Sequence, residues 1–475
     1  MKKRSIFLCI ITFLICYTTF GQSRIKAYFN HPVNTTVSHG VNAIYLPNGK
    51  MADTIVAYIN RAKYSLDIAQ YDYNQSTNYG AYANIAAAVN SAYLRGVTVR
   101  WIYNGSSSNT GLSQLNNGIP KLARASSSNG IMHHKFMIFD EESPNKNDPV
   151  ICTGSDDWSS EMFYQDYNNI LFIQDSALAY AYTAQFNQMW GSSGGTPNAA
   201  NAKFGSSKSD LGMHNFMIDG KLVNLYFSPT DGTNSKILNA ILSADTDIYF
   251  GVYTFTESAN ANSLVAKKNA GVYTLGIVDQ YTSTASANTY NILTSGLGAH
   301  LITYKTSTIY HNKLVIIDPS NSCSDPQVLT GSHNWTVSAD TYNDENTLII
   351  HSDTLANIYC QAFNADFTSL GGTVDSIGNC TVSHVGINKI DQTKNTISIY
   401  PNPSSSTINI HYETSYGKQS SIEIFSVTGQ KIGTVNEQGT GEHSVQYTFE
   451  RGGIYFIRFR TGDEFFFKKV VICKE

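Results

Sequence analysis

Two short stretches of the sequence decide the fold: MHHKFMIFD at residues 132–140 and YHNKLVIID at residues 310–318. Each places a His and a Lys two positions apart at the start of an apolar run, with an Asp five positions beyond the Lys. On a β-strand, residues i and i+2 point to the same face. We therefore expect two strands, each projecting a His and a Lys together from an otherwise apolar segment.

A second stretch follows each of these, TGSDDW at residues 153–158 and TGSHNW at residues 330–335. One His-x-Lys alone is a weak signal, because such a pair is usually a surface accident. Two copies at matching positions are hard to explain by packing. The polar residues that the copies share are therefore candidates for a common site: His133, Lys135, Asp140 and Ser155 in the first copy, and His311, Lys313, Asp318 and Ser332 in the second.

The similarity extends over two halves of a longer region. VNAIYLP at residues 41–47 returns as VNLYFSP at residues 223–229, and IAQY at residues 68–71 returns as FGVY at residues 250–253, both at one offset. Self-similarity of this kind indicates a duplicated unit. Because each half carries one His–Lys pair, we expect two lobes that form one active site.

Each half alternates between strand and helix patterns. Apolar periodicity predicts helices at residues 55–62 and 81–96 in the first half, and at residues 236–244 and 259–271 in the second. The segments between them have the composition of strands. This alternation predicts an α/β fold in which each half is a mixed sheet sandwiched by helices.

A chain of 475 residues exceeds one hydrophobic core, and its 42% hydrophobic and 14% charged residues suit a globular protein. Residues 191–210, rich in Gly, Ser and Asn, have the composition of a connector. We expect a first lobe at residues 22–200 and a second at residues 201–381. Short alternating strands then predict a C-terminal all-β sandwich at residues 396–475.

The N-terminus has the pattern of a secretory signal peptide at residues 1–21. Three basic residues precede an uncharged apolar run from Ile6 to Phe20, and Gly21 follows. A retained N-terminal anchor is the alternative, and it fits these flanks less well. Without residues 1–21, 29 basic and 36 acidic residues leave a net charge of −7. Enzymes that grip long nucleic acids usually carry a basic footprint, which this composition lacks.

The C-terminal stretch opens with ISIYPNPS at residues 397–404 and closes with KKVV at residues 468–471. It resembles the C-terminal sorting domain of proteins exported by the type IX secretion system. The resemblance implies export across the outer membrane and contact with that secretion machinery. A generic β-sandwich accessory module is the alternative, because a fold alone does not decide function. We expect a secreted or cell-surface protein after signal peptide cleavage.

The paired motifs resemble the HKD signature of the phospholipase D superfamily, over about residues 38–375. By this resemblance one His attacks phosphorus to form a phosphohistidine, while the other protonates the leaving group and then activates water. We assign His133 as the nucleophile and His311 as the acid. Lys135 and Lys313 would neutralise the phosphoryl oxygens, and the scheme requires no metal or other cofactor.

Further residues complete the predicted site. The hydroxyls of Ser155 and Ser332 and the amide of Asn334 can donate hydrogen bonds to phosphate oxygens. By resemblance, Glu345 matches the carboxylate that orients a catalytic His, and its counterpart in the first half is Asn168. Asp140 and Asp318 also belong to the family motif. Since each follows its Lys by five residues, at the end of an apolar strand, we expect a supporting role for them.

The sequence departs from the family pattern in two ways. Asp157 stands where the pattern has Asn, so a carboxylate there must be protonated, turned away or paired. Insertions at residues 141–149 and 319–326 lengthen the segments that follow the two motifs, and we expect them to be surface loops near the rim of the active site.

For several other residues, ordinary packing is an alternative to a role in the site. Strand alternation points His134 away from Lys135, which favours a structural role. Tyr71 and Tyr253 line either the cleft or the aromatic core. Cys152 lies in an apolar run and is expected to be buried. The sequence leaves open a disulfide among three of the other cysteines, Cys323, Cys360 and Cys380.

These features predict a secreted phosphodiester hydrolase, with phospholipid head-group release as the first choice and contact with a membrane surface. A secreted metal-independent nuclease of the same superfamily is the second choice, because it would use identical catalytic residues. A surface binding protein with a degenerate site is the third, suggested by Asp157 and Asn168. A monomer suffices for catalysis, because one chain carries both motifs.

Overall fold

The computed structural model describes residues 23–125, 130–322 and 324–375, and then 398–402, 404–414, 420–426, 430–437, 441–461, 464–472 and 474. The chain divides into two compact units at about residue 380. The signal peptide prediction, Cys323 and Cys380 lie outside the described residues. Cys152 is buried, as expected, and Cys360 has no disulfide partner among the described residues.

The first lobe is built on an eight-stranded mixed sheet with the order β2-β1-β8-β7-β6-β3-β4-β5. Its strands are β1 (Ile25–Phe29), β2 (Ile44–Tyr45), β3 (Ser65–Gln70), β4 (Thr98–Asn104), β5 (Lys121–Arg124), β6 (Lys135–Phe139), β7 (Val150–Gly154) and β8 (Asn169–Gln174). Its helices are α1 (Lys50–Arg61), α2 (Ile85–Leu94), α3 (Ser160–Tyr164) and α4 (Ser176–Trp190).

The second lobe repeats this plan with the order β13-β12-β11-β14-β15-β16-β10-β9. Its strands are β9 (Asn215–Ile218), β10 (Lys221–Ser228), β11 (Asp247–Val252), β12 (Tyr273–Asp279), β13 (Leu301–Tyr304), β14 (Lys313–Ile317), β15 (Gln327–Gly331) and β16 (Glu345–His351). Its helices are α5 (Thr233–Ser243), α6 (Ser258–Asn269), α7 (Tyr281–Ala285), α8 (Ala287–Leu297), α9 (Val337–Thr341) and α10 (Asp353–Ser369). Strands β1-β8-β7-β6-β3-β4-β5 correspond one to one with β10-β16-β15-β14-β11-β12-β13, which confirms the duplication.

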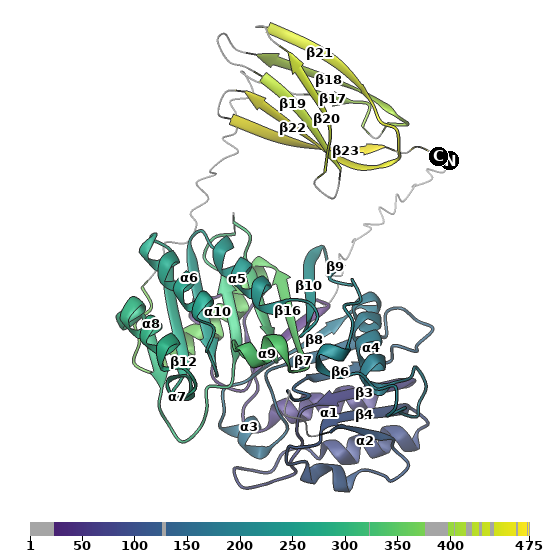
Figure 1. Cartoon of the computed structure of the whole chain (residues 1–475), viewed down its shortest axis with the longest axis vertical. Coiled ribbons are helices and arrows are strands. Elements are labelled where there is room, and N and C mark those ends of the chain that lie inside the picture. Colours follow the sequence, from purple (N-terminus) through teal and green to yellow (C-terminus); the bar gives the residue numbers. More distant parts are fainter. Residues whose placement is uncertain are drawn as a thin grey trace, which may run out of the picture. The chain divides into compact units, whose positions relative to one another are not determined.

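Helices cover the sheets of the two lobes (Figure 1). One hydrophobic core joins the two lobes. Helix α4 packs on β6 and β7, and α10 packs on β11, β14 and β15. Both helices contribute to the shared core, through Phe186 of α4 and Phe363 of α10 among others. Each lobe has a second core, which α1 and α2 cover in the first lobe and α5, α6 and α8 in the second. The apolar cores therefore hold both lobes in one body.

A buried ion pair crosses between the lobes. Asp344 has no exposed side-chain surface, and its carboxylate lies 2.6 Å from Arg124 Nη1 and 2.7 Å from Lys208 Nζ. Arg124 belongs to the first lobe, whereas Lys208 lies near the end of the connector at residues 191–210. The backbone of Asp344 also accepts a hydrogen bond from the N–H of His133 at 3.0 Å. This contact therefore ties the connector and both lobes together beside a predicted catalytic residue.

The C-terminal unit consists of a three-stranded and a four-stranded sheet, in the orders β17-β18-β21 and β20-β19-β22-β23. Its strands are β17 (Ser398–Tyr400), β18 (Thr407–Thr414), β19 (Ser420–Ser426), β20 (Lys431–Glu437), β21 (Gly441–Thr448), β22 (Gly453–Thr461) and β23 (Glu464–Ile472). The expected all-β fold is confirmed. Two of its strands, β20 and β21, are mostly polar and lack a strong apolar alternation.

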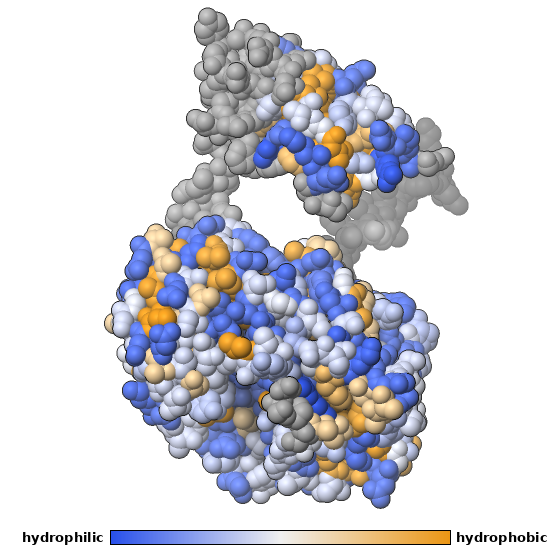
Figure 2. Space-filling model, in the orientation of Figure 1, coloured by the Kyte–Doolittle hydropathy of each residue, from blue (hydrophilic) through white to orange (hydrophobic). Residues whose placement is uncertain are grey.

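Among the described residues, no helix combines the length and the apolar character that crossing a bilayer requires. On the visible face of the molecule, hydrophobic residues lie in small groups among hydrophilic ones (Figure 2).

Replacing Asp344 tests the joint between the lobes. The substitution Asp344→Asn should lower the free energy of unfolding by about 3 to 5 kcal/mol, because it leaves two buried cations without that counter-charge. Urea unfolding followed by tryptophan fluorescence measures this unit, which contains all four Trp residues. The control Asp219→Asn alters a partly exposed pair with Arg24 and should cost at most about 1 kcal/mol. Equal losses in the two variants would contradict a buried joint.

Candidate active site

The two His–Lys pairs meet at one site between the lobes. Strand β6 begins at Lys135 and β14 begins at Lys313, and the matching His precedes each strand by two residues. The carboxylate of Asp157 joins the pairs, because it lies 3.0 Å from Lys135 Nζ and 3.9 Å from His311 Nε2. All four His and Lys side chains are nearly buried, with exposed fractions between 1% and 7%.

Each His is oriented by a residue of the opposite lobe. His133 Nδ1 lies 2.8 Å from Glu345 Oε2, and His311 Nδ1 lies 3.0 Å from Asn168 Oδ1. Glu345 begins β16, and Asn168 directly precedes β8, which is the equivalent strand of the first lobe. An acceptor at Nδ1 places the proton there and leaves Nε2 free for chemistry. A competent site therefore requires both lobes in their docked positions.

The two serines contact the groups that orient the histidines. Ser332 Oγ donates to Glu345 Oε2 at 2.6 Å, and Ser155 Oγ donates to Asn168 Oδ1 at 2.8 Å. Each hydroxyl also accepts a hydrogen bond from a backbone N–H of the neighbouring strand. From the sequence, these hydroxyls were expected to donate to phosphate oxygens. Their protons are instead engaged with the partners of the histidines, so a positioning role fits this geometry better.

Asp157 is paired with a lysine, which was one of the three states expected for it. Its counterpart in the second half is Asn334, whose Oδ1 is buried and has no hydrogen-bond partner among the described residues. An amide oxygen can only accept a hydrogen bond, so Asn334 can meet a phosphate oxygen only through its Nδ2 group. Asp157 is engaged with Lys135. The site is consequently unequal in charge on its two sides.

Asp140 and Asp318 lie at the opposite ends of their strands from the histidines. Asp140 Oδ1 accepts hydrogen bonds from the backbone N–H groups of residues 63–65, and Asp318 accepts from those of residues 245–247. Both adopt left-handed backbone conformations, with φ of 55° and 50°. We assign both a structural role, fixing the turn that enters β3 or β11.

The inserted loops follow Asp140 and Asp318, so they also lie at the far ends of β6 and β14. The expectation that they flank the active-site rim is wrong. The error came from sequence proximity, because the five-residue strand separates the histidine from the loop by its whole length.

Burial dominates the protonation of the site. It lowers the pKa of His133 and of His311 well below the usual value, and the neighbouring lysines lower both further. Burial, followed by the charge of Lys135, also lowers the pKa of Lys313. The pKa of Glu345 rises to about 7, again chiefly through burial. A neutral imidazole is what a nucleophilic His needs.

Aromatic side chains flank both pairs in the same way. The ring of Tyr71 lies edge-on to His133 at 4.8 Å and beneath Lys135 Nζ at 4.9 Å. Tyr253 lies edge-on to His311 and beneath Lys313 in the second lobe. These tyrosines therefore belong to the site. His134 points away from it and packs against aromatic rings of the core.

The sequence analysis missed the polar network that docks the lobes. Asn169 Nδ2 donates to Asn312 Oδ1 at 2.7 Å, and Asn346 Nδ2 donates to Thr153 Oγ1 at 2.8 Å. The two asparagines directly follow Asn168 and Glu345, at equivalent positions of the repeat. The self-comparison could have found them, since they are identical polar residues at the starts of two buried strands.

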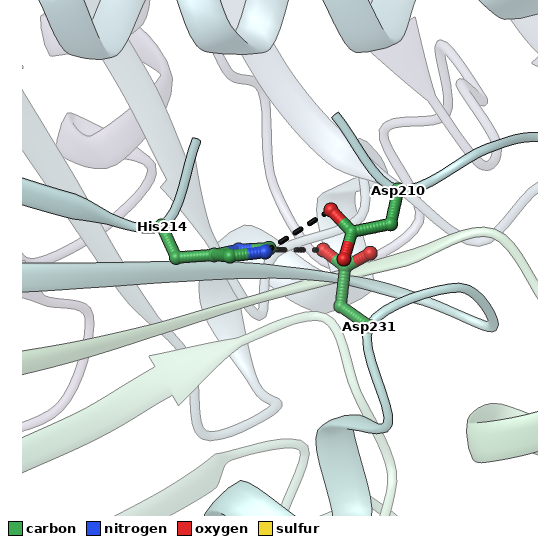
Figure 3. A group of neighbouring side chains, drawn as sticks. All are labelled: Asp210, His214 and Asp231. Atoms are coloured by element: carbon green, nitrogen blue, oxygen red, sulfur yellow. Dashed lines mark ion pairs between the residues drawn. The ribbon is translucent and has the colours of Figure 1, made fainter. Parts of the chain in front are cut away.

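One group of neighbouring side chains among the described residues has the composition of a metal site: Asp210, His214 and Asp231 (Figure 3). His214 Nε2 lies 3.0 Å from Asp210 Oδ1, whereas its Nδ1 lies 3.0 Å from the carbonyl oxygen of Leu225. Asp231 accepts from the N–H of Phe227 at 2.7 Å. Since these atoms already have protein partners, we assign the group to anchoring the connector on β10.

Asp166 provides a test of the site's electrostatics. Burial raises its pKa from 3.8 to about 7, so the folded state binds more protons than the unfolded state between these values. This contribution to stability is present at low pH and is lost as pH rises from about 4 to about 7. Asp166→Asn keeps an acceptor for the N–H of Ile309. As pH rises across this range, the urea midpoint of this variant should fall less than that of the wild type. Parallel curves for the two proteins would contradict the shift.

Comparisons with known proteins agree with this geometry. Residues 55–190 and 237–367 match the family model described as cardiolipin synthase, PLD-like domain, and residues 398–473 match the secretion system C-terminal sorting domain. A crystal structure of phosphatidylserine synthase from Haemophilus influenzae Rd KW20 covers 72% of this chain and 86% of that chain, at 13% identity and a TM-score of 0.50. That likeness shows the fold alone.

Two curated relatives match part of the chain. It is 30% identical over 140 residues to Phospholipase D of Rickettsia prowazekii (strain Madrid E), which is 29% of this chain and 64% of that protein. It is 31% identical over 134 residues to Mitochondrial cardiolipin hydrolase of Xenopus tropicalis, which is 28% of this chain and 60% of that protein. The chain thus spans less than two thirds of the length of either relative. The family model nevertheless covers more than half of this chain, which therefore belongs to the phospholipase D superfamily, with two PLD-like domains followed by a type IX secretion sorting domain.

Proposed function

We propose that this protein is an exported phospholipase D-type hydrolase that releases head groups from phospholipids. One observation carries the proposal: two complete His–Lys pairs share one site, and each His is held through Nδ1 by the other lobe. This arrangement leaves two Nε2 atoms available for a nucleophile and an acid. Membership in the superfamily supports phosphodiester chemistry.

The reaction takes two displacements at phosphorus. His133 Nε2 attacks phosphorus while the bond to the head-group oxygen breaks. His311 gives that oxygen its Nε2 proton, for which it must be in the imidazolium form; the negative charge of the bound phosphate favours that form against the effect of burial, which lowers the pKa of His311. The same His311 then takes a proton from water, and the resulting hydroxide displaces His133 from the phosphohistidine. Glu345 supports the first step, because a carboxylate at Nδ1 stabilises the positive charge that develops on the attacking imidazole. Lys313 and Asn334 are placed to hold the phosphoryl oxygens.

Phospholipid is the preferred substrate class for two reasons. Both relatives are named for the hydrolysis of lipids, as phospholipase D and cardiolipin hydrolase. The predicted mature chain is acidic, with a net charge of −7, whereas binding of long nucleic acids is favoured by basic surfaces. Transient contact with a membrane surface would bring this substrate to the enzyme.

The location that suits this activity is outside the cell. The sorting domain at residues 398–473 indicates secretion or attachment at the cell surface. We propose that residues 1–21 direct the chain across the inner membrane first, and that the type IX machinery then recognises the C-terminal unit. A single chain contains the whole site, so a monomer suffices.

A secreted nuclease is the second candidate, since the same residues can cleave a nucleic acid backbone. A binding protein with a degenerate site is the third. The intact His–Lys pairs argue against it, because a decaying site would lose such costly buried groups. The substrate therefore has to be tested directly.

The test compares the mature chain with His133→Ala and His311→Ala in EDTA, on phosphatidylcholine vesicles and on single- and double-stranded DNA. Choline release that falls by about a hundredfold or more in both variants is expected, because general acid and nucleophile are each lost. His351→Ala is the matched control, because His351 ends the strand that Glu345 begins, and it should retain full activity.

DNA cleavage without choline release would replace the phospholipase assignment with the nuclease. Failure on both substrates, in a folded protein, would favour the binding protein or another phosphodiester.

A further inference from the structure

The duplicated site contains an internal comparison. Gly154-Ser155-Asp156-Asp157 in the first lobe corresponds to Gly331-Ser332-His333-Asn334 in the second, so a carboxylate on one side stands where an amide stands on the other. The two side chains have the same shape and differ by one charge. An exchange between Asp and Asn at either position therefore changes the charge of the site with little change in shape.

The carboxylate of Asp157 lies within the phosphate-binding machinery. Its Oδ1 is 3.0 Å from Lys135 Nζ, and its Oδ2 is 3.9 Å from His311 Nε2. The side chain is 5% exposed, so water screens its charge poorly. The ammonium of Lys135 is thus already neutralised before a substrate arrives.

Several titratable groups lie within reach of the charge of Asp157. Its charge acts on His133 and on Lys313 as well as on its contact partners. Asp72 and Asp156 lie on the same side and in reach of its charge, and burial followed by the charge of Asp157 raises the pKa of each. The titratable groups that face Asp157 are therefore Lys135, Lys313, His133, His311, Asp72 and Asp156. With Lys135 neutralised, Lys313 is the cation of this group that remains for a ligand.

We propose that Asp157 is a specificity-determining residue that makes the site favour a monoanionic phosphodiester over a dianionic phosphomonoester. The inference rests on the proposed phosphodiesterase function. A diester carries one negative charge, whereas the monoester product of its hydrolysis carries up to two near neutral pH. The second charge is repelled by Asp157 and meets no free partner in Lys135. The substrate is therefore retained while the product is expelled.

The test uses two small probes that differ in one charge. Dimethyl phosphate is a monoanion, and monomethyl phosphate at pH 8 is a dianion. Their binding to the mature full-length chain is measured by isothermal titration calorimetry, which requires no turnover. Asp157→Asn should increase the binding affinity for monomethyl phosphate by about tenfold or more, and the affinity for dimethyl phosphate by much less. The reason is that repulsion between close, poorly screened charges grows with the charge of the ligand.

Two matched variants complete the test. Asp157→Glu keeps the charge and should keep the wild-type preference. Asn334→Asp adds a carboxylate to the second half. It should weaken the binding of monomethyl phosphate more than the binding of dimethyl phosphate. If Asp157→Asn fails to fold, Asn334→Asp still tests the proposal, because it should lower the affinity for the dianion where Asp157→Asn should raise it.

Equal changes for both probes in Asp157→Asn, or in Asn334→Asp, would overturn the proposal, because a merely structural role affects both ligands alike. A supporting kinetic reading is weaker product inhibition in the wild type than in Asp157→Asn. If the probes behave as expected but no diester is hydrolysed, the charge selection stands and the proposed hydrolase function fails.

Discussion

The active site depends on hydrogen bonds that cross between the lobes. His133 is held by Glu345 and His311 by Asn168, and in each case the donor and the acceptor belong to different halves of the duplication. Neither half can orient its own histidine. The shared hydrophobic core and the buried contacts of Asp344 hold the lobes in the position that these hydrogen bonds require. Docking of the lobes and assembly of the site are therefore one event, and an isolated lobe would present an incompletely oriented motif.

Duplication gives this site its symmetry, and single substitutions then remove it. Glu345 is equivalent to Asn168 in the repeat, and Asn334 is equivalent to Asp157. One carboxylate, Glu345, therefore lies at Nδ1 of His133, and the other, Asp157, lies 3.9 Å from Nε2 of His311. Glu345 at Nδ1 of His133 suits an imidazole that becomes positive when it attacks. Asp157 near Nε2 of His311 suits an imidazole that must hold a proton for the leaving group. Two equivalent motifs can thus take unequal roles without a change in the fold.

Much of this arrangement could be predicted from the sequence. The repeat predicted two equivalent α/β lobes, and strand alternation placed each His and Lys on one face and His134 on the other. The groups that lie at each end of a strand were harder to predict. Both inserted loops were assigned to the rim, although Asp140 and Asp318 begin them at the far ends of β6 and β14. The serine hydroxyls were assigned to the phosphate, because spacing reveals proximity and does not reveal which acceptor a hydroxyl finds. Asp344 escaped notice because a buried ion pair between distant segments leaves no local pattern.

The central claim is that His133 forms a covalent phosphohistidine in a site completed by the second lobe. The most direct measurement is to mix the His311→Ala variant with an activated aryl phosphodiester, quench the reaction and locate the adduct by mass spectrometry. An aryl leaving group needs little protonation, and the missing histidine can no longer activate water, so the adduct should accumulate on His133. A phosphoryl adduct on any other residue, or turnover without an adduct, would contradict the account.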